Sequence, residues 1–346
     1  MGWLPSWNYR IKITVNNEYV DADLTDFPMY VDLADLPAGF HTYVNQTDGR
    51  DIRVTEADGM TEVPREVVFY DAATDTGELH FKGDILNSTD VDFYIYYGNT
   101  SATEPAIDST YGAENVWRSE YKGVWHFPNG STLTTLDSTL NDNDATATGV
   151  NASVGKLGGG ASADAGEEID FGTGNSLNVN GNGTFEFWAQ QNGDSLNGTY
   201  TGYLARFNAA ITAGYQIYNL NSDHKIGFYS NTSCNVKSSY VISDTNWHHV
   251  VVTDDGSYIT FYVDGNQIGS PIAGTSVGTT SAAHHQIIGF NNINTLNGQI
   301  DEFRISNWVA SSTWISTEYN NQNDPSSFFT IGAAEVNAGV MFFSLL

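Results

Sequence analysis

Apolar and polar residues alternate in short segments through the early part of the chain, between residues 9 and 99. The segment YRIKITV (9–15) puts its apolar residues on one face of an extended strand and Arg10, Lys12 and Thr14 on the other. Five further segments of this kind follow, separated by turns that contain Asn, Asp or Gly: 27–33, 48–55, 66–71, 77–83 and 91–99. The spacing of these strands is typical of a β-sandwich.

A second series of alternating segments begins at YKGVWHF (121–127). Its clearest member is residues 246–270, where Asp255-Gly256 and Asp264-Gly265 are hairpin-turn dipeptides that flank alternating strands. Only 312–322 has a helical pattern, with Ser312 as a candidate N-cap.

These patterns predict an all-β chain of two β-sandwich domains. The first is expected over residues 1–103 and the second over 117–333, with a linker at 104–116 where the periodicity is lost. A polar, loop-like stretch follows the helix, and an apolar tail occupies 334–346.

Charge and composition exclude several classes of protein. The chain has 41 acidic and 13 basic residues, a formal net charge of −28, so a basic nucleic-acid footprint is not expected. No apolar run approaches the roughly 20 residues of a membrane span. Cys234 is the single cysteine, which rules out an internal disulfide, and the N-terminus does not read as a signal peptide.

Two families are recognisable from motifs that occur in order along the chain. WNYRIKITV, ADLTDFPMYVDL, DGRDIRVTEADG, GELHFKG and FYIYYGN resemble a widespread β domain known as domain of unknown function 2341, which implies no established chemistry. GVWHF, DSTLNDNDAT, FEFWAQ, WHHVVVTDDG, FYVDGNQIG and GQIDEFRIS are similar to a laminin-G-like jelly roll of the concanavalin A-like lectin/glucanase class. The resemblance therefore implies that the second sandwich is a jelly roll.

The pairing of these two domains is similar to proteins of tailed phages and of microbial surfaces. The resemblance implies a non-enzymatic virion structural or adhesion protein, in a tail, fibre or capsid decoration, which contacts glycans, other virion proteins or further copies of itself. Cytoplasmic assembly and release by lysis would fit the N-terminus and the lack of disulfides. The alternatives are a secreted or cell-surface carbohydrate-binding protein and, less favoured, an enzyme that degrades polysaccharides.

The enzymatic alternative depends on residues 168–172, EIDFG. Glycoside hydrolases of the concanavalin A-like class carry E-x-D-x-x-E on one strand, which supplies a nucleophile and an acid/base. Glu168 and Asp170 match the first two positions, but Gly172 and Thr173 stand where the last carboxylate is needed. We therefore expect no catalytic residues here.

Asp301 presents a different problem, because period-2 alternation puts it on the same face of a strand as Phe303 and Ile305. A carboxylate directed at a core needs a partner. The loop DSTLNDNDATA (137–147) concentrates oxygen ligands of the kind that calcium prefers, including Asp137, Asn141 and Asp144. The alternative for the loop is a set of Asx turns that satisfy its own backbone.

The jelly-roll resemblance implies that the loop and Asp301 meet, and we predict a structural calcium ion held by Asp137, Asn141, Asp144 and Asp301. A backbone amide or a basic side chain is the alternative partner for Asp301. Arg304 is expected on the opposite strand face with Glu302, as a solvated pair.

Three further groups of residues are candidates for function or packing. The pairs His248–His249 and His284–His285 lack the spacings of a zinc site and are expected to be structural. Tyrosines of the middle strands could pack in the core or form a sugar platform, and the sequence does not separate the two roles: Tyr200, Tyr203, Tyr215, Tyr218 and Tyr229. The apolar run at 340–346 is expected to be covered, and docking on a neighbouring subunit of a homo-oligomer is favoured over packing on the chain itself.

Overall fold

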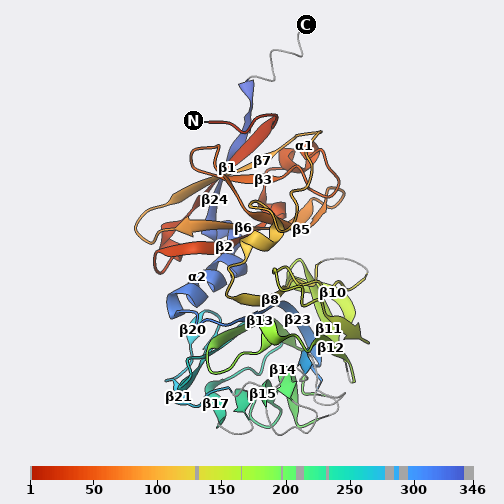
Figure 1. Ribbon diagram of the computed structural model, residues 1–346, viewed down its shortest axis with the longest axis vertical. Coiled ribbons are helices and arrows are strands. Elements are labelled where there is room, and N and C mark those ends of the chain that lie inside the picture. Colours follow the sequence, from red (N-terminus) through yellow and green to blue (C-terminus); the bar gives the residue numbers. More distant parts are fainter. Residues whose placement is uncertain are drawn as a thin grey trace. The chain divides into compact units, whose positions relative to one another are not determined.

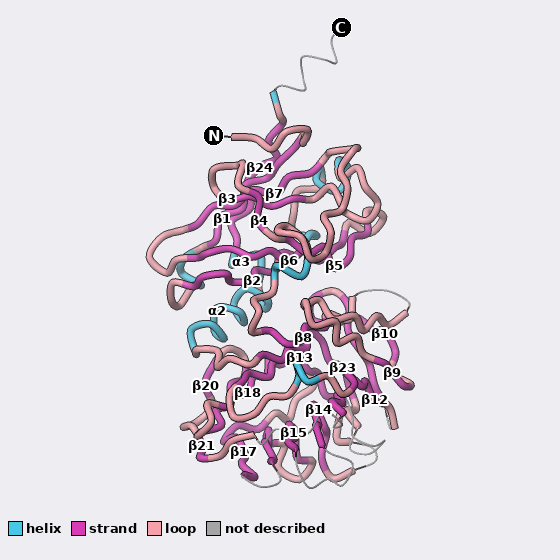
Figure 2. Tube along the Cα trace, viewed as in Figure 1, coloured by secondary structure: helices cyan, strands magenta, loops and turns pink. Residues whose placement is uncertain are grey.

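The computed structural model describes residues 2–128, 132–164, 166–195, 198–207, 214–230, 234–276, 284–287 and 295–338. Most of the regular structure in these residues is β-strand, and the prediction of an all-β chain is confirmed (Figure 2). The chain divides into two compact units, one formed by Met1–Arg118 with Ser316–Leu346 and the other by Ser119–Ile315. In the described residues no helix is long and apolar enough to cross a membrane.

The first unit contains a five-stranded and a three-stranded antiparallel sheet. The five-stranded sheet has the order β24 (Phe329–Val336), β1 (Tyr9–Val15), β7 (Val91–Tyr97), β3 (Arg53–Glu56) and β4 (Glu62–Val63). The three-stranded sheet has the order β2 (Leu24–Asp32), β6 (Thr76–Ile85) and β5 (Arg65–Asp71). Short helices complete the unit: α1 (Gly39–Tyr43), most of α2 (Ser312–Asn323), α3 (Pro325–Phe328) and 3-10 turns at Asn17–Tyr19, Leu33–Asp35 and Ala113–Val116.

The last strand of the first unit comes from the far end of the sequence. Strand β24 pairs antiparallel with β1, from Val15 opposite Phe329 to Tyr9 opposite Val336 (Figure 1). Arg10 on β1 stabilises this pairing, because its Nε donates to Oε2 of Glu335 on β24 at 2.7 Å. The guanidinium of Arg10 also lies over the ring of Trp3.

This pairing corrects the predicted domain boundaries and the predicted tail. The second unit ends at Ile315 rather than at 333, because the polar stretch after the helix is not a loop but contains α3 and β24. Residues 334–336, assigned to the tail, are the end of β24, and 339–346 lie outside the described residues. The predicted linker at 104–116 groups with the first unit, which extends to Arg118.

The alternating apolar residues of β1 pack in the core of the first unit, as the sequence pattern predicts. Ile11, Ile13 and Val15 are buried between the sheets, where Phe81 and Phe93 meet with ring centroids 5.0 Å apart. A fully buried carboxylate also belongs to this unit. Asp51 accepts hydrogen bonds from the backbone amides of four residues in two segments: Asn45, Gln46, Gly98 and Asn99.

The second unit is a sandwich of two larger antiparallel sheets. The first has the path β10 (Asn151–Leu157), β11 (Gly159–Ala163), β23 (Gly298–Ser306), β13 (Gly183–Gln191), β18 (Trp247–Asp254), β19 (Tyr258–Val263) and β20 (Asn266–Gln267), with β8 (Tyr121–Trp125) paired to β23 and β21 (Ile272–Ala273) to β19. The other has the order β17 (Cys234–Val241), β16 (Lys225–Ser230), β15 (Gly214–Leu220), β14 (Tyr200–Phe207), β22 (His284–Ile287), β12 (Glu168–Gly172) and β9 (Thr146–Thr148). A 3-10 turn lies at Asn175–Leu177.

Aromatic and β-branched residues of both sheets fill the core of the second unit. Trp125 and Phe171 stack with centroids 3.8 Å apart, and Phe187 stacks on Phe303 at 5.4 Å. The predicted helix is present, but its N-cap is one residue earlier than expected, because the Trp314 amide donates to Ser311 Oγ at 3.1 Å.

Candidate functional site

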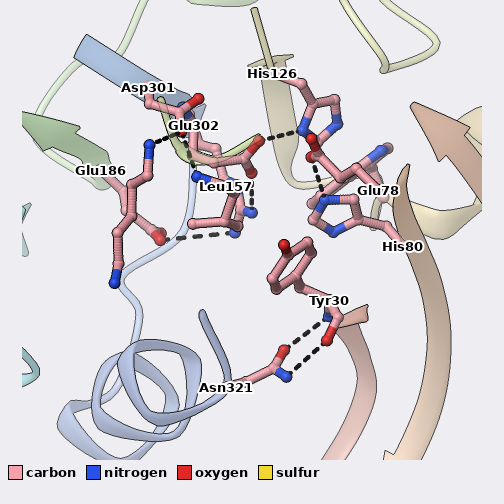
Figure 3. A network of polar contacts seen from close by, with 12 residues as sticks. Tyr30, Glu78, His80, His126, Leu157, Glu186, Asp301, Glu302 and Asn321 are labelled. Carbon is pink, nitrogen blue, oxygen red and sulfur yellow. Dashed lines mark hydrogen bonds and ion pairs between the residues drawn. The ribbon is translucent and has the colours of Figure 1, made fainter. Parts of the chain in front are cut away.

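Backbone amides are the observed partners of Asp301. Its Oδ2 accepts hydrogen bonds from the amides of Lys156 and Leu157, each at 2.9 Å, and its Oδ1 accepts one from the amide of Glu302 at 2.7 Å (Figure 3). The carboxylate is fully buried and ties the end of β10 to β23. Burial and the adjacent Glu302 raise the pKa of Asp301, while the amide donors act in the opposite direction.

A β-bulge at Glu302 decides where Asp301 points. Glu302 has φ +49°, and the register of β23 against β13 shifts between Glu186 and Trp188. As a result Asp301 lies opposite Trp188, outside the core cluster that contains Phe303. The predicted common face of Asp301 and Phe303 is therefore wrong, because the extra residue of a bulge reverses the alternation.

The loop that follows β8 is organised by Asp137. Asp137 Oδ1 accepts the amides of Val124 and Thr139, at 3.0 and 2.9 Å, and its Oδ2 accepts the amide of Asn143 at 2.9 Å. The Asp137 amide in turn donates to Asp144 Oδ1 at 2.9 Å. Burial raises the pKa of Asp137 despite these donors.

Asn141 completes the loop by anchoring it to β8. Its side-chain amide donates to the carbonyl of Tyr121 at 3.2 Å and to Thr139 Oγ1 at 3.0 Å. The structure therefore brings Asp137, Asn141 and Asp144 into one hydrogen-bonded loop, whereas the hydrogen bonds of Asp301 go to the end of β10 and to Glu302.

The residues of the predicted calcium site do not fit a cation well. Amide hydrogens carry partial positive charge and converge on the carboxylate oxygens of Asp137 and Asp301, where a calcium ion would need to bind. The contacts favour the two alternatives that the sequence left open, an Asx-turn loop and amide partners for Asp301. Calcium binding at these residues stays a prediction.

A row of charged and imidazole side chains crosses the larger sheet of the second unit. His249 Nε2 is 2.9 Å from Glu186 Oε1, which is 3.6 Å from the Arg304 guanidinium. Arg304 donates to Glu302 Oε2 at 2.6 Å, and Glu302 Oε1 is 2.5 Å from His126 Nδ1. The prediction that Glu302 and Arg304 pair is confirmed, but both are buried and not solvated.

This row has little room for a ligand within its own unit. The cavity beside Glu186 and Arg304 has a volume of about 10 Å³, which is space for about one water molecule. Its other walls include Tyr121, Trp308 and Trp314. We therefore assign the row to the stability of the sheet.

His248 and His249, the first of the predicted structural pairs, make different contacts from each other. His248 lies between two carboxylates, with Nδ1 2.8 Å from Asp264 and Nε2 2.9 Å from Asp244, while His249 belongs to the charged row. The hydrogen bond to Asp264 raises the pKa of His248 against the effect of burial, and Asp244 adds to the rise.

Strand β12 carries the incomplete hydrolase motif. Ile169 and Phe171 point into the core, so Glu168 and Asp170 share the opposite face, as predicted. Asp170 accepts the amide of Gly172 at 2.7 Å and so caps the end of its own strand.

The structure shows which of the candidate tyrosines pack in the core and which lie on the outer face of the sheet. Tyr203 and Tyr215 belong to the core cluster. Tyr200 and Tyr218, with ring centroids 5.2 Å apart, lie on the other face of the seven-stranded sheet, and Tyr229 is on that face too because its neighbour Phe228 faces the core. We call this surface, defined by Tyr200, Gln216, Tyr218, Tyr229 and Asn235, the outer tyrosine face.

Polar groups accompany these rings. Tyr218 donates to Asn235 Oδ1 at 3.1 Å, and Gln216 lies in register with Tyr229. The Gln216 side chain is buried, and its Nε2 has no hydrogen-bond partner in the described residues. Aromatic faces beside amide donors are the usual components of a polar ligand site.

Most of the second unit matches the model of a known protein family. Residues 163–316 match the Concanavalin A-like lectin/glucanases superfamily, as the sequence resemblance implied. The chain therefore contains a concanavalin A-like jelly-roll domain. No curated protein sequence matches the chain.

Several solved structures are similar to the chain at low identity. Domain 4 of AbnA, an extracellular arabinanase from Geobacillus stearothermophilus, in complex with arabinotriose, has 16% identity and a TM-score of 0.47, with 57% of this chain and 97% of that chain covered. The binding domain of Paraclostridial Mosquitocidal Protein 1 has 16% identity and a TM-score of 0.45, with 58% and 52% covered.

The ligand binding domain of botulinum neurotoxin serotype D, in complex with N-acetylneuraminic acid, has 14% identity and a TM-score of 0.44, with 59% and 51% covered. The chain thus spans about half the length of these toxin domains.

Proposed function

We propose that the chain is a non-enzymatic binding protein whose jelly roll contacts a glycan through the outer tyrosine face. The observation that carries this proposal is the match of residues 163–316 to a lectin-like domain, in which the seven-stranded sheet presents tyrosines away from the core. The incomplete motif at Glu168 and Asp170 supports binding without hydrolysis.

We propose that the chain is part of a virion, where it forms a self-associating tail, fibre or capsid-decoration component. Support comes from the order of the two domain types along the chain, which resembles tailed-phage structural proteins. A secreted or cell-surface carbohydrate-binding protein is the second candidate, and the match to a lectin-like domain favours it equally. Mass spectrometry of purified particles from the source tests the setting: the chain should be present at structural copy number, and its absence would favour the second candidate.

A glycan array probed with the full chain tests the function. Replacement of Tyr229 by Ala should weaken binding about fivefold, because one aromatic contact is lost. Tyr258→Ala is the matched control, since Tyr258 is an exposed tyrosine on β19 of the other sheet. Equal losses in both variants, or release of reducing sugar from a bound polysaccharide, would contradict the proposal.

Self-association has its own test. Light scattering should give a mass above that of one chain, and deletion of residues 339–346 should lower it while β24 is retained. A monomeric full chain would remove this part of the proposal.

A further inference from the structure

An open groove of about 630 Å³ lies in the first unit, in the size range of ligand sites. Its apolar walls come from both sheets and the loop after β6: Val63, Pro64, Gly83, Leu86, Val91 and Phe93. Phe93 is fixed by its contact with Phe81, and a Cβ at Gly83 would come within 2.6 Å of the Phe93 ring. The groove is therefore shaped by core residues.

Carboxylates surround this apolar floor. The groove is lined by Asp26, Glu56, Glu62, Asp84 and Asp92, with Lys82 as the only basic residue among its walls. This composition gives the lining a net charge of −4.

Some of that charge is balanced nearby. Lys82 is 3.6 Å from Asp26, Lys12 is 3.2 Å from Asp92, and Arg53 is 3.1 Å from Glu62.

Two carboxylates remain without a basic partner among the described residues. Glu56, at the end of β3, makes no side-chain hydrogen bond or ion pair with them, and Asp84 accepts only the backbone amide of Asp26, at 2.9 Å. Both side chains are exposed. The groove thus combines an apolar floor with two uncompensated negative charges.

We propose that this groove binds a short basic segment of a partner protein, with Lys or Arg side chains at Glu56 and Asp84 and an apolar residue near Leu86. Basic side chains suit both parts of the groove, because their aliphatic stems cover apolar surface while their charged ends reach the carboxylates. Charge complementarity of this kind steers association and selects partners.

Other occupants fit less well. A second copy of this chain has a net charge of −28, and residues 339–346 contain no Lys or Arg, so neither complements the groove. A lone metal ion would leave the apolar floor uncovered. The proposal is independent of the glycan function, because every residue of the groove belongs to the first unit.

Fluorescence anisotropy with the full chain and a labelled octapeptide of alternating lysine and leucine tests the proposal. Glu56→Gln and Asp84→Asn should each weaken binding about threefold, and the double variant about tenfold. Leu86→Ser should weaken it about threefold. Asp75→Asn is the matched control, since Asp75 is an exposed aspartate beside the other end of β6, at φ +55°, which Asn also tolerates.

The result expected is loss of affinity in the groove variants only, with unchanged melting temperatures. The proposal would be overturned by equal weakening in Asp75→Asn, which would indicate attraction to net charge alone. Equal binding of the peptide with glutamate in place of lysine would also overturn it. The proposal would also be overturned if spermidine competes fully with the peptide and the affinity of spermidine is unchanged by Leu86→Ser. The ligand would then be a simple polycation and not a peptide.

Discussion

Carboxylates of the groove in the first unit and carboxylates on the large sheet of the second unit have opposite surroundings. Asp84 and Glu56 are exposed in the groove and have no basic partner among the described residues. Asp301 and Glu302 are buried and saturated, the first by three amides and the second by Arg304 and an imidazole.

The difference shows how one residue type serves two purposes in an acidic chain. A carboxylate removed from water must be compensated by the fold, so it becomes part of the structure. A carboxylate that stays in water at the rim of a groove costs little and remains available to a partner. Net charge alone, which is −28, does not distinguish the two.

The strongest contrast is expected in stability. Asp301→Ala should lower the free energy of unfolding by about 3 kcal/mol or more, because three amides lose their acceptor. Asp84→Ala should change it by no more than about 0.5 kcal/mol, as is usual for an exposed residue. Urea denaturation of both variants measures the difference, and equal effects would show that the comparison is wrong.

Chelation of divalent ions distinguishes the two interpretations of Asp301, as a calcium ligand or as an acceptor for backbone amides. The calcium prediction requires a loss of stability in EDTA of about 2.7 kcal/mol when calcium is 100-fold above its dissociation constant. The amide interpretation, which the hydrogen bonds favour, predicts the same melting temperature with and without EDTA. A shift that Asp301→Asn abolishes would decide for calcium.

A small effect is expected at His248, where an imidazole lies between two carboxylates. A pKa raised in the folded state means that this contact stabilises fully below the unfolded pKa of about 6.5 and is lost as pH rises through the folded pKa. His248→Gln should flatten the pH dependence of stability above about pH 6.5, by less than about 1 kcal/mol.

Melting curves between pH 5 and 9 measure this change. Asp255→Asn, in the neighbouring hairpin, is the control, because Asp255 has no histidine contact among the described residues. A control that flattens the profile as much as His248→Gln would contradict the role of the imidazole.

Local patterns in the sequence were sufficient to predict much of the fold. Alternation in YRIKITV predicted a strand with Ile11 and Ile13 buried, and β1 has that packing. Asp264-Gly265 predicted a turn, and β19 and β20 pair across it. Glu168 and Asp170 share the face expected for them. Each of these features depends on neighbours in the sequence, so the sequence by itself determined them.

Long-range contacts decided the rest. Pairing of β24 with β1 closes the first unit across most of the chain length, and nothing in FTIGAAEV specifies that partner. The bulge at Glu302 reverses the predicted direction of Asp301, because an inserted residue is visible only against the partner strand. The groove, too, arises where two sheets meet. A residue's partners across a sandwich are set by packing of the whole unit, and period-2 patterns carry no information about them.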